Sequence, residues 1–118
     1  MNITVVAAAQ MGSYIAKNDD GSYYVITLDD ARGIDFGDVL AGKFDRHGSL
    51  LYVVRNVTKR EDVRISLENW ESPLDPAIKM LLKFMSSRPG KIFVGAREFQ
   101  SDKSGVEGQL REAILKAA

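Results

Sequence analysis

The sequence contains no cysteine and a single histidine, His47, and these shortages exclude several kinds of site. Without thiols the chain has neither a disulfide scaffold nor a zinc site built on cysteine. With one imidazole, a metal site built on several histidines is impossible, and only a mixed site rich in carboxylates remains. We therefore expect neither a bound metal nor another cofactor.

Long apolar runs and an excess of one charge are also missing. No apolar stretch approaches the roughly 20 residues needed to span a bilayer. Residues 1–9 show neither the basic start nor the cleavage site of a signal peptide. The 16 Lys and Arg residues balance the 16 Asp and Glu residues. These features predict a cytoplasmic protein with no membrane partner.

The balanced charges are unevenly distributed along the chain. Residues 1–45 hold 3 basic and 7 acidic side chains, whereas residues 46–91 hold 9 basic and 5 acidic ones. Such asymmetry indicates either a face that binds polyanions or two segments that lie side by side and neutralise each other. The second interpretation is favoured, because a dedicated nucleic-acid binder usually has a basic net charge.

The first 71 residues show the period of two that is typical of β-strands, and turn-forming residues separate the runs. Asn18-Asp19-Asp20-Gly21 predicts a hairpin turn, since Asn, Asp and Gly tolerate left-handed backbone. Seventy residues are too few for two full sheets, so we expect a small antiparallel β-barrel-like sheet of OB or SH3-like size. The expected strands are residues 2–9, 12–17, 22–28, 39–44, 49–58 and 63–67.

The remaining residues, 72–118, predict a helix-strand-helix segment that packs on the sheet. Pro73 and Pro76 suit the first turn of a helix, and apolar residues then recur at helical spacing until Pro89. Residues 91–96 predict a strand, residues 97–104 a mobile connection, and residues from Val106 onward an amphipathic helix. The whole chain is therefore expected to be one α+β domain.

One glycine-containing segment shows a family likeness. Gly33-Ile34-Asp35-Phe36-Gly37-Asp38-Val39-Leu40 resembles the tight turn of many small β-barrels, including the second domain of translation GTPases. The features shared are glycine for positive φ, aspartate to bond the turn amides and apolar residues for the core. The resemblance implies barrel geometry and carries no function.

Catalytic chemistry has little support. His47 lies between Arg46 and Gly48 in an expected turn, which indicates an exposed loop residue and not a general base. The acidic pairs at 19–20 and 29–30 lack the alternating spacing of a calcium loop and suit turns. We therefore expect that the protein is not an enzyme.

Two binding functions remain open. A single-strand nucleic-acid interface would combine stacking aromatics with basic side chains, and an OB-like face could present Tyr23 and Tyr52 beside Arg55 and Arg64. The alternative is that these tyrosines are core or rim residues with their hydroxyls at the surface, which is where tyrosine usually lies. A protein-recognition surface needs no catalytic residue, and Trp70 could anchor it, although a core plug is the favoured role of this tryptophan.

The sequence thus predicts a non-catalytic binding module of the inhibitor, immunity, adaptor or small-subunit type. Its expected partner is a protein or a second copy of the chain, and single-stranded nucleic acid is the alternative. The candidate binding residues are Tyr23, Tyr52, Arg46, Arg55, Lys59, Arg60, Arg64 and Trp70.

Overall fold

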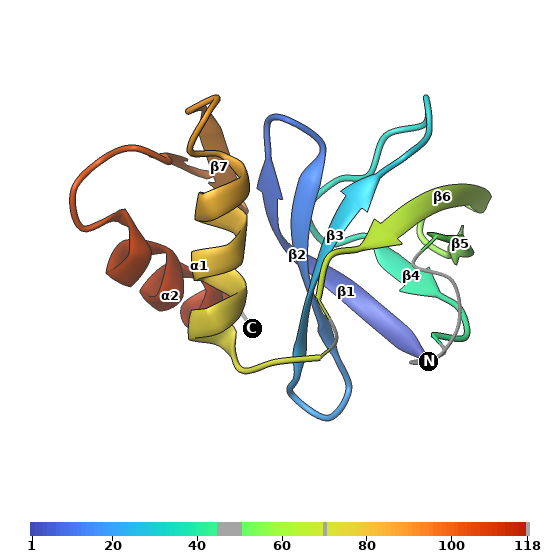
Figure 1. The fold of residues 1–118 in the computed structure, drawn as a ribbon. Helices are drawn as coiled ribbons and strands as arrows, with labels where there is room; N and C mark the ends of the chain where they lie inside the picture. Colours follow the sequence, from blue (N-terminus) through green and yellow to red (C-terminus); the bar gives the residue numbers. More distant parts are fainter. Residues whose placement is uncertain (45–50, 70, 118) are drawn as a thin grey trace.

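The computed structural model describes residues 1–44, 51–69 and 71–117 (Figure 1). Strands wrap into a barrel on one side of the molecule, and the two helices lie together on the other side. The elements in chain order are β1 (Asn2–Ala9), β2 (Ser13–Asn18), β3 (Tyr23–Leu28), β4 (Val39–Ala41), β5 (Leu51–Asn56), β6 (Glu61–Leu67), α1 (Leu74–Phe84), β7 (Lys91–Val94), β8 (Arg97–Gln100) and α2 (Val106–Ala117).

The barrel is a closed ring of six antiparallel strands in the order β1, β2, β3, β6, β5, β4. The ring closes where Ile3 of β1 pairs with Leu40 of β4. The small antiparallel barrel expected for the first 71 residues is therefore confirmed, as is the α+β class. Closure leaves the six barrel strands with neighbours on both sides for part of their length.

Strand β1 carries a β-bulge that changes which way its side chains point. Val5 pairs with Ala16 and Ala7 pairs with Ile15, so Val6 is an extra residue in β1. Ile3 and Val5 before the bulge point into the barrel, whereas Ala7 after it points toward the helices. The bulge therefore lets one strand serve two hydrophobic cores.

The two cores lie on opposite faces of β1, β2 and β3. In β3, Tyr24 faces the barrel interior and Val25 faces the helices, as alternation along a strand requires. The buried residues of the barrel core are Ile3, Val5, Tyr14, Ala16, Tyr24, Ile26, Ile34, Leu40, Val54, Val63, Ile65 and Leu67. The helix-facing core includes Ile15, Val25, Ile78, Leu81, Met85, Ile92, Leu110 and Ile114.

The C-terminal part widens the sheet and covers it. Strand β7 pairs with the end of β1 through Ala8 and Ala9, and β8 pairs with β7. The sequence predicted a mobile connection from residue 97, and this is wrong for residues 97–100, which form β8. The reason is that Phe99 is buried in the helix-facing core, so this strand has a packed side chain that holds it in place.

Gly42 lies close to the side chain of Val54 in the barrel wall, and this contact allows a test of the packing. A Cβ added to Gly42 would lie 2.9 Å from Cγ1 of Val54, whereas one added to Gly33 would meet nothing within 4 Å. We expect Gly42→Ala to lower the free energy of unfolding by about 1–3 kcal/mol through overpacking. The matched control Gly33→Ala should change it by less than about 0.5 kcal/mol. Urea unfolding measures both values, and equal values would contradict this packing.

Candidate binding surfaces

The outer surface of β5 and β6 carries exposed aliphatic side chains. Leu51 is 54% exposed and Val53 is 67% exposed, whereas Val54 between the outward positions is buried in the barrel. Val53 pairs with Arg64 of β6, and Arg55 pairs with Asp62. We call Leu51, Val53, Arg55, Asp62 and Arg64 the β5–β6 outer face. Of the expected binding residues, Arg55 and Arg64 lie on this face.

The two candidate tyrosines do not share this face. The Tyr23 side chain is only 5% exposed and lies in the helix-facing core, and its burial raises the pKa of its hydroxyl. Tyr52 packs against the barrel core and contacts the Phe44 ring edge-on, with ring centroids 5.3 Å apart. The expected platform of Tyr23 and Tyr52 side by side is therefore corrected, because alternation sends them to different cores.

The candidate basic residues differ in how they are engaged. The Lys59 ammonium lies 2.6 Å from Asp35 and 3.3 Å from Asp38, so it is held inside the protein's own network. The Arg55 guanidinium lies 3.3 Å from the Asp62 carboxylate on the surface. Arg60 sits in the turn before β6 with a φ of 59° and an exposed side chain. Arg46, His47 and Trp70 lie outside the described residues.

Several acidic side chains of the first third contact the basic middle segment. Asp30 accepts a hydrogen bond from the backbone N–H of Arg64. An ion pair of the opposite polarity joins Arg32 of the first third to Glu61 of the middle segment at 3.7 Å. Lys59 joins the acidic turn at Asp35 and Asp38. These contacts support the interpretation that the two oppositely charged segments lie together and neutralise each other. Most of these contacts are on the surface, so they contribute little to stability and chiefly cancel the local electrostatic field.

The turn that resembles other small barrels is held by a buried polar network. Asp38 Oδ2 accepts hydrogen bonds at 2.9 Å from both the Asp35 backbone N–H and the Asn56 side-chain amide. Burial alone would raise the pKa of Asp38, but these two bonds and the Lys59 ammonium outweigh burial and lower it. The network ties the turn to the end of β5.

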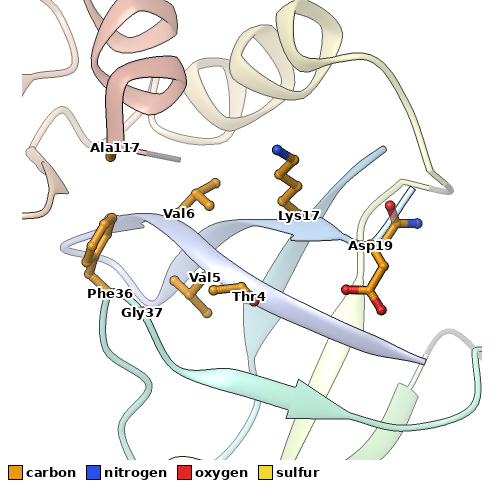
Figure 2. A pocket seen from close by; sticks show the side chains of 9 residues that line it. Thr4, Val5, Val6, Lys17, Asp19, Phe36, Gly37 and Ala117 are labelled. Atoms are coloured by element: carbon orange, nitrogen blue, oxygen red, sulfur yellow. The ribbon is translucent and has the colours of Figure 1, made fainter. Parts of the chain in front are cut away.

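A groove lies along the outer face of β1 and β2, and the same turn borders it through Phe36 and Gly37 (Figure 2). It has a volume of about 470 Å³. Thr4 and Val6 of β1 and Lys17 of β2 form its floor, Phe36 and Gly37 form one wall, and Ala117 at the end of α2 borders it. Sequence reasoning missed this groove, because the expected β1 was covered on both sides along its whole length.

Within the described ranges, 1–44, 51–69 and 71–117, no group of three or more His, Asp or Glu side chains is placed to hold a metal ion. No helix of this part of the chain is long and apolar enough to cross a bilayer.

Comparison with other proteins adds no identification. No protein-family model, no curated protein and no solved structure matched this chain. The class that the structure itself defines is a closed six-stranded antiparallel barrel followed by a helix, a β-hairpin and a second helix.

The lowered pKa of Asp38 predicts how stability depends on pH. A carboxyl whose pKa is lowered by folding contributes stability that is complete above about pH 4, the ordinary range of aspartate, and is lost as pH falls through the folded-state value. Asp38→Asn removes this charge, so wild type should exceed the variant at neutral pH by about 1–3 kcal/mol in unfolding free energy. This difference should shrink in acid.

Denaturant unfolding at several pH values measures the difference, and Asp102→Asn in the exposed turn after β8 is the control variant. A gap between wild type and Asp38→Asn that is the same at neutral and acid pH would contradict the assigned role of the carboxylate.

Proposed function

We propose that this chain is a non-catalytic binding module that recognises a protein partner through the β5–β6 outer face. The observation that carries the proposal is the exposure of Leu51 and Val53, two aliphatic side chains at successive outward positions of one strand. The inward positions of the same strand, including Val54, fill the barrel core. Adjacent exposed aliphatics beside polar residues are typical of the centre of an interface.

Arg64 gives this face its charge character. It lies directly across from Val53, and within the described part of the chain its guanidinium makes no ion pair. A hollow of about 130 Å³ lies beside it, lined by Asp29, Leu51, Tyr52, Val53 and Arg64. Arginine next to a small apolar hollow is a frequent hot spot of binding energy. The partner expected here presents an apolar side chain for the hollow and a carboxylate for Arg64.

Single-stranded nucleic acid is the second function that the sequence left open, and the geometry supports it less. Tyr23 is buried and therefore offers no ring to a base. Lys59 and Arg55 both contact carboxylates of the protein itself. A strand of nucleic acid would have to displace these carboxylates while finding few exposed aromatics.

Site-specific photo-cross-linking tests the proposed face. A photoreactive residue at position 53 should give one discrete adduct in cells that make the protein, while the same residue at position 115 should not. Leu115 on α2 is the matched control because it is also an aliphatic residue that is more than half exposed, at 57%. The mass of the adduct separates a second copy of this chain from a different protein.

Affinity for the purified partner then decides the proposal. Val53→Asp and Arg64→Glu should each weaken binding by about tenfold or more, as expected for hot-spot positions, whereas Leu115→Asp should leave it unchanged. The assignment would be overturned if both positions cross-linked equally well. It would also be overturned if Val53→Asp left the affinity for the partner unchanged.

Fluorescence polarisation with a labelled oligo-dT at low ionic strength tests the nucleic-acid alternative. We expect no affinity that declines steeply with salt, because Arg55 and Lys59 already contact carboxylates of the protein and the net charge of the chain is zero. Salt-sensitive binding that Arg55→Glu and Arg64→Glu abolish would instead assign the same face to nucleic acid.

A further inference from the structure

The groove lies on β1 and β2 beside the C-terminal end of α2. Helix α2 borders it at Ala117, the one helical residue among the described residues that line the groove. Val6, the bulge residue, packs only partly against the helix-facing core and keeps an open side toward the groove. The floor is therefore apolar at Val6 and polar at Thr4 and Lys17, which pair directly across the two strands.

The wall of the groove is preformed. The N–H of Gly37 donates to the Val5 carbonyl at 2.9 Å, and the N–H of Val5 donates to the Asp38 carbonyl at 2.9 Å. Gly37 has a φ of 86°, which favours glycine, so the backbone of the turn suits the residue found there. These bonds fix the turn against β1 and present the Phe36 ring along the edge of the groove (Figure 2). A rigid wall lowers the entropic cost of binding.

Lys17 supplies the charge. Its side chain is half-buried, and its ammonium makes no ion pair or hydrogen bond to the residues that the structure describes. Asp19 also lines the groove, but its carboxylate lies more than 4.0 Å from that ammonium and forms no salt bridge with it. A half-buried cation beside apolar side chains is stabilised when an anion binds to it.

From this juxtaposition we infer that the groove is a binding site for a small organic monocarboxylate with an apolar body. The carboxylate lies on the Lys17 ammonium and the Thr4 hydroxyl, and the apolar body covers Val6 and Phe36. The volume of about 470 Å³ falls within the range of small-molecule sites. Asp19 at the rim repels any anion, and it repels a doubly charged group such as a phosphate monoester more strongly than a singly charged carboxylate.

Titration of the isotope-labelled protein with octanoate, followed by NMR, tests this site. Octanoate should shift the amide signals of Thr4, Val6, Lys17 and Gly37 in a saturable manner. Octanol, which has the same apolar body without the charge, and octyl phosphate should each bind about tenfold more weakly. Phe36→Ala should weaken both octanoate and octanol, because it removes the apolar wall.

Lys17→Met removes the charge while keeping the length of the side chain, and it should weaken octanoate about tenfold while leaving octanol unchanged. Lys103→Met is the control, since Lys103 is exposed and lies before the opposite end of α2, roughly 18 Å away for a helix of this length. It should not change either affinity. Val53→Asp should also bind octanoate normally, so failure of this inference is separable from failure of the proposed function.

Equal affinities for octanoate and octanol would overturn the inference. So would an octanoate affinity that Lys17→Met leaves unchanged in a protein whose spectrum is otherwise unchanged. Signal shifts that fall outside the groove would also overturn it. Absence of any shift up to the solubility limit of octanoate would overturn it as well. If Lys17→Met does not fold, Lys17→Gln takes its place with the same expected loss.

Discussion

The extra residue in β1, Val6, is the constraint on which the rest of the structure depends. Side chains of a regular strand alternate, so a continuous β1 would send Ile3, Val5, Ala7 and Ala9 to one face. The bulge breaks this alternation and sends the first two into the barrel and the last two toward the helices. One strand can thereby close the barrel through β4 and extend the sheet through β7.

Both candidate surfaces follow from these two roles of β1, which closes the barrel and extends the sheet. Ala7 and Ala9 in the second half of β1 pack in the helix-facing core, whereas Thr4 and Val6 line the groove that α2 borders at Ala117. On the far part of the barrel, β5 and β6 pair in full and have an outer face that no described helix covers, so Leu51 and Val53 stay exposed. The Asp38 network connects the two regions, because it joins the wall of the groove to the end of β5 through Asn56.

The sequence predicted the strands, the two helices and the barrel because turn residues and period-two runs are local signals. It did not predict the bulge, since residues 3–9 are nearly all apolar or small and show no break in pattern. For the same reason it did not tell whether Tyr23 or Tyr24 enters the barrel, as both faces of β3 are apolar. The exposure of Leu51 and Val53 could not be predicted either, because nothing in the local sequence distinguishes an aliphatic residue that points outward from one that points into the core. Strand β8 was missed because Arg97 and Glu98 look like a charged loop, whereas in the structure β8 pairs with β7 and buries Phe99 in the helix-facing core.

If β1 unites the two layers, the barrel and the helix-covered sheet unfold as one cooperative unit. Native-state hydrogen exchange of wild type and Gly42→Ala tests this most directly, since Gly42 lies in the barrel wall against Val54. The account predicts that amides of the β1–β4 pairing and of the β1–β7 pairing lose protection by the same amount in the variant. Loss confined to the β1–β4 amides, with the β1–β7 amides unchanged, would contradict it.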